Sequence, residues 1–240
     1  MSQTSLCAPA KSDPDIPPKD GPASNRTANF DRIARPYRWL EYLSFGPLLQ
    51  RTRTHWISAV SHCRSALVLG DGDGRFTAAL LAANPRIHIH AVDLSPTMLS
   101  LLRSRCDASR ITTEAADLRS WQPRAGTSYD LITAHFFLDC LTTGEISTLA
   151  NRLAPALQQE AIWLVTDFAI PHTSYGRFIA TPIVQSLYAA FALLTGLGVR
   201  KLPDHDTALK RGGWQLQHAH QRAAGLLISQ LWKLRKLSKR

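Results

Sequence analysis

The sequence lacks the cysteine patterns of a disulfide framework or a zinc site. Its cysteines lie far apart, with no Cys-x-x-Cys pair and no cysteine–histidine ligand spacing. They are Cys7, Cys63, Cys106 and Cys140. Residues 1–28 also lack the apolar segment of a secretory signal, and they are rich in Pro, Ser, Asp and Lys. We therefore expect a cytoplasmic protein whose first 28 residues form a disordered arm.

Acidic residues are scarce relative to basic ones, with 18 Asp and Glu against 28 Lys and Arg and a formal net charge of +10. The basic excess is concentrated in residues 31–60 and 201–240, near the two ends of the chain. Such clustering is typical of proteins that meet a membrane surface or a nucleic acid, and also of a solvated basic surface. The charge pattern alone leaves these alternatives open.

The chain length and the apolar pattern predict one domain, covering residues 29–240. Helices are expected over residues 29–60, followed by alternating apolar strands and amphipathic helices. Expected strands cover 66–70, 87–92, 110–115, 129–135 and 161–168, and expected helices cover 74–84, 95–106 and 143–157. Continuous apolar strands between helices indicate a doubly wound α/β sheet that is covered on both faces. The last apolar segments, WQLQHAHQR and LLISQLWKLR, predict an antiparallel pair.

A charge-free run covers residues 178–199 and is long enough to cross a bilayer. The segments before and after it are both expected to join the same sheet, so a single crossing would separate them. We therefore expect a helical lid over the substrate, within an insert covering residues 172–211. A lid that also touches lipid stays open, and with it a peripheral location at the inner face of a membrane.

Three glycines mark the turn VLGDGDGRF between the first strand of the sheet and the following helix. They are Gly70, Gly72 and Gly74. A dinucleotide-binding turn follows the pattern G-x-G-x-x-G, but its last glycine is replaced here by Arg75. Asp71 and Asp73 would also oppose a pyrophosphate electrostatically. The turn therefore favours a ligand that carries positive charge and no phosphate.

Asp93 ends the next strand, 19 residues after Gly74. A carboxylate at this position can bind both hydroxyl groups of a ribose. Together with the glycine turn, it indicates a cationic cofactor that contains a ribose.

Four motifs, in this order and spacing, resemble those of class I S-adenosylmethionine-dependent methyltransferases. They are VLGDGDGRF, AVDLSPTML, AADL and YDLITAHFFLD. The resemblance covers roughly residues 28–236. It implies a Rossmann-like sheet of seven strands, six parallel and the last antiparallel, with S-adenosyl-L-methionine as the cofactor.

The resemblance also implies a set of cofactor-binding residues. They are Tyr37, Gly70, Asp71, Gly72, Gly74, Asp93, Leu94, Met98, Asp117, Leu118 and His135. Asp93 would bind the ribose, Leu94 and Met98 would pack on the adenine, and Asp117 would accept a hydrogen bond from the adenine amino group. Tyr37 would close over the cofactor, although an aromatic residue at helical spacing can also belong to the core.

One position departs from the family pattern. Members usually carry an acidic residue two positions before the first glycine, where this chain has Val68. Asp71 or Asp73 could compensate, and the contacts to the methionine part of the cofactor stay open. A non-catalytic binding protein that keeps the cofactor fold is therefore an alternative to an enzyme.

Two further segments resemble ubiquinone and menaquinone C-methyltransferases. They are NFDRIARPYRWLEYLSFG in the N-terminal region and TDFAIPHTSYGRF after the fifth strand. This second resemblance implies a small, hydrophobic or aromatic acceptor. The fourth strand is not followed by the Asn-Pro-Pro-aromatic or Asp-Pro-Pro-aromatic motif of amino-methylating enzymes, which argues against a nucleic-acid substrate. The basic tail KLRKLSKR nevertheless keeps an RNA methyltransferase as an alternative. The identity of the acceptor, the atom methylated and the oligomeric state stay open.

His135 follows the fourth strand and is the candidate general base, because open α/β sheets bind ligands at the carboxyl ends of their strands. The alternative is a histidine that only packs there. The pairs His88/His90 and His218/His220 alternate along strands but have no third ligand nearby in sequence. We expect these pairs to be surface histidines and the protein to bind no metal.

Overall fold

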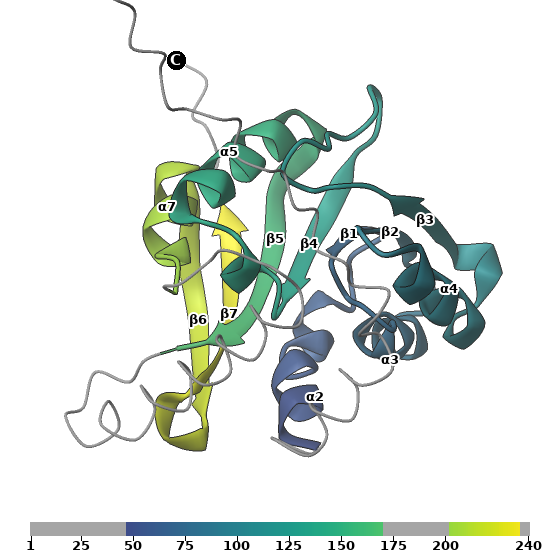
Figure 1. The fold of residues 1–240 in the computed structure, drawn as a ribbon, viewed down its shortest axis with the longest axis horizontal. Helices are drawn as coiled ribbons and strands as arrows, with labels where there is room; N and C mark the ends of the chain where they lie inside the picture. The colour runs from purple at the N-terminus through teal and green to yellow at the C-terminus, as the bar shows by residue number, and fades with distance from the viewer. Residues whose placement is uncertain (1–46, 170–201, 236–240) are drawn as a thin grey trace, which may run out of the picture.

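The computed structural model describes residues 47–169 and 202–235, which form one twisted sheet with helices on both faces (Figure 1). The strands are β1 (Ser65–Leu69), β2 (His88–Asp93), β3 (Ile111–Ala115), β4 (Tyr129–His135), β5 (Leu157–Phe168), β6 (Trp214–Arg222) and β7 (Leu227–Leu234). The α-helices are α2 (Pro47–Arg53), α3 (Arg75–Ala83), α4 (Pro96–Arg105), α5 (Thr143–Leu153) and α7 (His205–Arg211). Short 3-10 helices are η2 (Ile57–Val60), η3 (Ala108–Arg110), η4 (Leu138–Cys140), η5 (Ala154–Ala156) and η6 (Ala223–Gly225).

The strand order in the sheet is β3-β2-β1-β4-β5-β7-β6. The pairs from β3 to β5 are parallel, whereas β7 runs antiparallel to both β5 and β6. Six strands therefore share one direction and β7 opposes them, which confirms the predicted fold class. The chain moves outward from β1 through β2 to β3, then returns to the other side of β1 as β4. This reversal creates a topological switch point between β1 and β4, where open α/β sheets bind their ligands.

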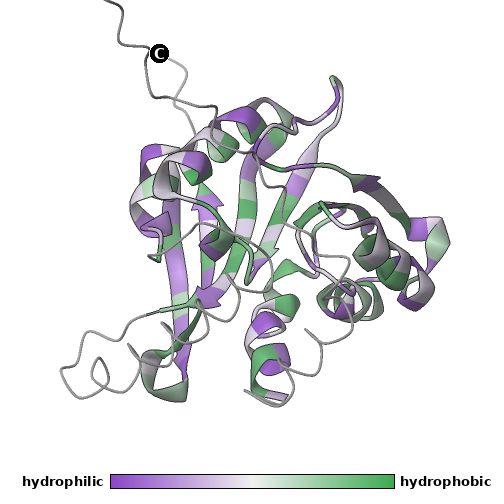
Figure 2. Ribbon diagram, viewed as in Figure 1, coloured by the Kyte–Doolittle hydropathy of each residue, from purple (hydrophilic) through white to green (hydrophobic). Residues whose placement is uncertain are grey.

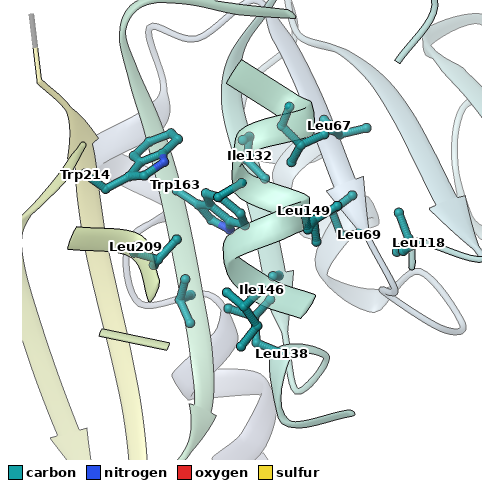
Figure 3. Close-up of a cluster of buried hydrophobic side chains, with 14 of the residues drawn as sticks. Leu67, Leu69, Leu118, Ile132, Leu138, Ile146, Leu149, Trp163, Leu209 and Trp214 are labelled. Carbon is teal, nitrogen blue, oxygen red and sulfur yellow. The ribbon is translucent and has the colours of Figure 1, made fainter. Parts of the chain in front are cut away.

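Two buried clusters fill the space between the sheet and its helices. On one face, α5 and α7 cover the strands, and Trp163 contacts Trp214 edge-to-face with ring centroids 5.2 Å apart (Figure 3). On the other face, α3 and α4 cover them. Strand β1 supplies Leu67 and Leu69 to the first cluster and Ala66 and Val68 to the second. This burial on both faces explains its continuous apolar sequence.

The sequence placed β5 too late and the helix before it too long. Helix α5 ends at Leu153, because Pro155 cannot continue the hydrogen-bonding pattern of an α-helix and a 3-10 turn follows. Strand β5 then begins at Leu157 with the exposed segment Gln-Gln-Glu, whose polar character hides the strand. Glu160 adopts φ 62°, and the pairing of β4 with β5 shifts register in the same region.

The β6 edge is polar and largely exposed, as Figure 2 shows by its mainly hydrophilic colour. Its pairing with β7 confirms the predicted antiparallel pair. Within residues 47–169 and 202–235, no helix is long and apolar enough to cross a membrane. The arm 1–28, the N-terminal helices up to residue 46 and the run 178–199 lie outside the described residues, so the domain boundaries drawn there stay predictions.

Candidate cofactor site and active site

The carboxyl ends of the strands bring together most of the residues expected from the motifs. Gly70 follows β1, Asp93 ends β2, Asp117 comes two residues after β3, and His135 ends β4. The topological switch point lies between Gly70, which follows β1, and His135, which ends β4. Tyr37 lies outside the described residues.

The glycine turn adopts left-handed backbone conformations that other residues rarely accept, with φ of 62° at Gly70, 59° at Gly72 and 77° at Gly74. A Cβ atom on Gly70 would lie 2.5 Å from the ring of Phe137, and one on Gly74 would lie 2.7 Å from Cγ of Leu102. At Gly72 the nearest atom is Sδ of Met98, at 3.9 Å. Gly70 and Gly74 thus allow close packing within the chain, whereas Gly72 leaves open space beside the backbone.

Replacing Gly74 with Ala should destabilise the protein by about 2–5 kcal/mol. The left-handed φ contributes about 1–2 kcal/mol, and overpacking contributes about 1–3 kcal/mol because the new methyl group meets the backbone of Leu102 at 2.9 Å. Urea unfolding of the variant measures the change. Gly126→Ala is the matched control, since Gly126 has φ 84° but nothing within 4 Å. An equal loss in both variants would show that the contact with Leu102 costs nothing.

Both carboxylates of the turn have partners within the protein. Oδ2 of Asp71 accepts hydrogen bonds from the backbone N–H (2.9 Å) and the hydroxyl (2.7 Å) of Thr77, in the first turn of α3. Asp73 forms ion pairs with Arg75 at 3.1 Å and Arg105 at 3.2 Å. Asp71 therefore caps a helix and Asp73 is neutralised by two arginines. Val68 is buried in the core, so the usual acidic position contributes no carboxylate.

Burial raises the pKa of Asp71 to about 6, despite its hydrogen bonds to Thr77 and the nearby positive charge of Arg53. A raised carboxyl pKa means that the folded protein favours the protonated form, so the stabilising contribution is present below about pH 4 and lost as pH rises to 6. Asp71→Asn should therefore gain stability relative to the wild type by about 1–3 kcal/mol between pH 4 and pH 7. Urea unfolding across this range measures the difference. If the free energy of unfolding depends on pH in the same way in both proteins, the pKa of Asp71 is not raised.

Asp93 is held by backbone groups from two loops. Oδ1 accepts from Ser95 N–H at 2.9 Å, and Oδ2 accepts from Gly72 N–H at 3.3 Å. Ser95 in turn caps α4 by accepting from the N–H of Met98. The structure thus places the predicted ribose-binding carboxylate beside Gly72 and Met98. Leu94 follows directly and is half-buried.

Asp117 lies on the loop after β3, and its carboxylate is held by Arg119. Oδ1 accepts from the backbone N–H of Arg119 at 2.9 Å, and the guanidinium lies 3.8 Å away. The backbone N–H of Ala116 donates to the carbonyl of Asp93, which ties this loop to the end of β2. The side chain of Leu118 is buried in the core, so any ligand contact there would use its backbone.

His135 is 4% exposed, and its ring lies against Phe76 with centroids 4.1 Å apart. Neither ring nitrogen has a hydrogen-bond partner among the described residues. Burial, and to a lesser extent the positive charge of Arg53, hold the pKa of His135 well below its usual 6.5. The imidazole is therefore neutral at pH 7, which is the form that can accept a proton. A buried polar group without a partner is costly to the fold and is a mark of a functional position.

Sequence reasoning missed three features beside His135. Arg53, at the end of α2, is only 9% exposed, and its guanidinium lies 5.0 Å from the centroid of the Phe136 ring. Phe136 adopts φ 53°, a strained conformation for a bulky residue. Phe137 packs beneath Gly70. The position of Phe136 and Phe137 after the strand was visible in the sequence, but the burial of Arg53 depends on tertiary packing.

A buried carboxyl group lies on the opposite face of the sheet from His135. Asp167, near the end of β5, is 1% exposed and accepts hydrogen bonds from the backbone N–H groups of Asp139 (3.1 Å) and Phe168 (3.0 Å). Burial, together with the negative charge of Asp139, raises the pKa of Asp167 well above its usual range. It is a second group near the strand ends that could exchange a proton.

Two of the paired histidines, His90 and His220, have contacts that the sequence did not indicate. Nδ1 of His90 lies 2.7 Å from the hydroxyl of Tyr129, and Nε2 lies 3.2 Å from Glu114, so His90 belongs to a half-buried polar network rather than the open surface. His220 stacks on His55 with centroids 3.9 Å apart. In the part of the chain that the structure describes, no three His, Cys, Asp or Glu residues are grouped to hold a metal.

Comparison with known proteins assigns the class of the fold. A family model described as a methyltransferase domain matches residues 66–160. Among curated protein sequences, none matches the chain.

Solved structures share the fold at low identity. The mitomycin 7-O-methyltransferase MmcR has a TM-score of 0.62 and 19% identity, over 88% of this chain and 62% of its own. The N,N-8-amino-8-demethyl-D-riboflavin dimethyltransferase RosA from Streptomyces davawensis has a TM-score of 0.57 and 19% identity, over 88% of this chain and 63% of its own. The N-methyltransferase NodS from Bradyrhizobium japonicum, in complex with S-adenosyl-L-homocysteine, has a TM-score of 0.61 and 16% identity, over 86% of this chain and 97% of its own.

Residues 66–160 match the methyltransferase-domain model, and the described residues have the Rossmann-like fold that these solved structures share. The match to a methyltransferase domain and the S-adenosyl-L-homocysteine bound to NodS agree with the class and the cofactor expected from the motifs. The chain spans less than two thirds of the length of MmcR and RosA but nearly all of NodS. The resemblance to quinone C-methyltransferases stays a prediction.

Proposed function

We propose that this protein transfers a methyl group from S-adenosylmethionine to a small, hydrophobic or aromatic molecule. The observation that carries the proposal is the arrangement of Gly72, Asp93 and Met98 beside the switch point. The ring of His135, which has no hydrogen-bond partner among the described residues, lies at the end of β4 on the other side. MmcR and RosA are named for methylation of an oxygen and a nitrogen of small molecules, which supports an acceptor of this kind.

The donor set fits this cofactor. Asp93 offers a carboxylate to two ribose hydroxyl groups, and Asp117 offers one to an amino group of the adenine. The turn carries two aspartates and leaves space only beside Gly72, so it suits a phosphate-free ligand. When bound, S-adenosylmethionine supplies a methyl group on a sulfonium, which is open to in-line displacement by a nucleophile.

The protein's own part in the reaction is alignment and proton removal. The nucleophile must be held about 3 Å from the methyl carbon, in line with the breaking bond. An acceptor hydroxyl or acidic carbon must also lose a proton, and a neutral His135 imidazole at the end of β4 can take it. Phe136 and Phe168, with ring centroids 5.1 Å apart at neighbouring strand ends, offer an apolar surface to an aromatic acceptor.

Incubation of the purified protein with S-adenosylmethionine and a metabolite extract tests the proposal. We expect formation of S-adenosyl-L-homocysteine together with at least one small molecule that gains a methyl group. If calorimetry shows tight cofactor binding but no fraction of the extract is methylated, the non-catalytic alternative is supported instead. Methylation confined to RNA in the extract would contradict the small-molecule acceptor.

Contact with a membrane surface also stays a proposal. The charge-free run 178–199 and much of the basic excess lie outside the described residues. Basic residues near a membrane contribute about 1 kcal/mol each to binding of anionic lipid. Sedimentation with anionic vesicles at low and high salt would detect the association.

A further inference from the structure

Two buried hydroxyl groups lie side by side in the sheet, on the same face as His135. Oγ1 of Thr166 on β5 and Oγ of Ser229 on β7 are 3.2 Å apart, and both side chains are buried. The next pair on the same face of these strands is Leu164 and Leu231, which belong to the apolar cluster. Burial of a hydroxyl costs free energy that burial of an apolar side chain does not. The fold alone therefore does not require hydroxyl groups at these two positions.

The register of the sheet extends this pair into a row of polar side chains. His135 on β4 is paired with Thr166, and Ser229 is paired with His220 on β6. Residues paired in register point to the same face of a sheet, and neighbouring strands lie about 4.8 Å apart. We call His135, Thr166, Ser229 and His220 the polar row. It extends from the end of β4 to β6, the edge strand of the sheet (Figure 1).

The outer end of the polar row is a pair of stacked imidazole rings. The ring of His220 stacks on that of His55, which follows α2, with centroids 3.9 Å apart and an interplanar angle of 13°. Both histidines are only partly buried, so solvent reaches this end of the row. Burial, followed by the charges of His220 and Arg222, lowers the pKa of His55. Its imidazole is therefore neutral at pH 7 and can take up a proton and release it to water.

The inner end of the polar row is the proposed general base. His135 is buried, and neither of its ring nitrogens has a hydrogen-bond partner in residues 47–169 and 202–235. A base that takes a proton from the acceptor must lose it again before the next turnover. The lowered pKa of His135 favours this loss, but burial separates the ring from bulk water. Thr166 is its polar neighbour in register on β5.

We propose that the polar row carries the proton that His135 removes from the acceptor to His220 and His55, where it is released to solvent. Each hydroxyl accepts a proton on its oxygen and passes its own proton on, so one proton enters the row at His135 and one leaves it at His220. No group in the row is consumed. The steps from His135 to Thr166 and from Ser229 to His220 are completed by rotation of the side chains or by one bridging water.

Thr166 and Ser229 thus act through His135 rather than on the acceptor itself. The assignment rests on the proposed function, because it takes His135 as the base.

Exchange of the His135 ring proton with water tests the path without any substrate. With isotope-labelled histidine in the folded protein, NMR measures how fast the N–H proton of the neutral imidazole exchanges. Thr166→Val keeps the size of the side chain but removes its hydroxyl. We expect it to slow this exchange on the order of tenfold or more, because a positioned proton-transfer group typically contributes about 10²- to 10⁴-fold. Thr166→Ser keeps the hydroxyl and should exchange as fast as the wild type.

Thr133→Val is the matched control. Thr133 is also a buried threonine, on β4 two residues before His135 and on the same face of the sheet. It is paired with Leu164, so it lies outside the polar row. Its replacement removes a buried hydroxyl near the base and should leave the exchange rate of the His135 proton unchanged.

Enzyme kinetics give a second readout that a purely structural role would not change. In the first turnover His135 only takes up a proton, whereas every later turnover needs that proton to leave. Thr166→Val should therefore keep the dissociation constant of the cofactor and the rate of the first turnover, and it should slow the turnovers that follow. Thr166→Ser should restore them.

The outcomes separate this assignment from the proposed function. If Thr166→Val exchanges as fast as the wild type, the proton leaves by another route and the assignment is overturned. If Thr166→Ser slows exchange as much as Thr166→Val does, packing is the cause and the assignment is again overturned. Slow exchange in Thr166→Val alone establishes the path.

Two further outcomes have a defined reading. If the wild type forms no S-adenosyl-L-homocysteine with any acceptor, the proposed function fails, and slow exchange in Thr166→Val would still establish the path itself. If circular dichroism shows that Thr166→Val is unfolded, Ser229→Ala replaces it, because it interrupts the same row on the neighbouring strand.

Discussion

Replacing His135 with Leu should lower the rate of methyl transfer by about 10²- to 10⁴-fold, the usual contribution of a general base. The same change should leave the free energy of unfolding unchanged or raise it by about 1–2 kcal/mol, because it removes two buried ring nitrogens that have no hydrogen-bond partner in residues 47–169 and 202–235. Such a loss of activity without a loss of stability is typical of a functional residue kept at a cost to the fold. Single-turnover formation of S-adenosyl-L-homocysteine and urea unfolding measure the two effects.

His90→Leu is the matched control for this prediction. His90 is a half-buried histidine with partners on both ring nitrogens, Tyr129 and Glu114. Its replacement should therefore lower stability by about 1–3 kcal/mol and leave turnover within a few-fold of the wild type. If His135→Leu behaves in the same way, His135 is a packing residue and the catalytic assignment is wrong.

The pH dependence of the rate distinguishes His135 from Asp167 as the proton acceptor. A base must be unprotonated, so the rate falls as pH drops through its pKa. Burial holds the pKa of His135 well below 6.5, which predicts a rate that is flat around neutral pH. Burial and Asp139 raise the pKa of Asp167 well above its usual range, so a base at Asp167 would move the acid limb of the profile toward higher pH. If a His135 variant stays active and its rate still falls at this higher pH, Asp167 is the base.

The sheet and the position of Asp93 at a strand end could be predicted because their signals are local. Apolar strands that are buried on both faces, such as β1, have a continuous apolar sequence, and Asp93 ends its strand at the spacing expected from the glycine turn. The start of β5 was missed because its first residues are polar and exposed. At this end only Leu157 pairs with β4, opposite Tyr129 and before a shift of register, and such backbone pairing leaves no apolar pattern in the sequence.

The electrostatics of the site could not be read from the sequence. Asp73 is neutralised in part by Arg105, which lies 32 residues further along the chain, at the end of α4. Arg53 reaches the site because α2 packs beside α3, and no local pattern distinguishes it from the exposed Arg51. The left-handed conformation of Phe136 could not be predicted either, because most residues with positive φ are glycine or asparagine. Charges and strain of this kind depend on contacts between distant segments.

Replacing Asp93 with Ala should weaken binding of S-adenosylmethionine by about 1.5–3 kcal/mol, or roughly 10- to 150-fold, because two ribose hydroxyl groups lose a charged acceptor. Part of the loss could arise indirectly, since the carboxylate also accepts from Gly72 and Ser95 and so orders both loops. A ligand without the 2′-hydroxyl separates the two causes. Its affinity relative to S-adenosyl-L-homocysteine should be much lower in the wild type, and this difference should shrink in Asp93→Ala, if the carboxylate binds that hydroxyl directly. Asp93→Asn, which keeps an acceptor oxygen for the loops but loses the charge, should show an intermediate affinity. Calorimetry on variants with native circular dichroism gives these values. An unchanged dissociation constant in Asp93→Ala would contradict the placement of the ribose at the end of β2.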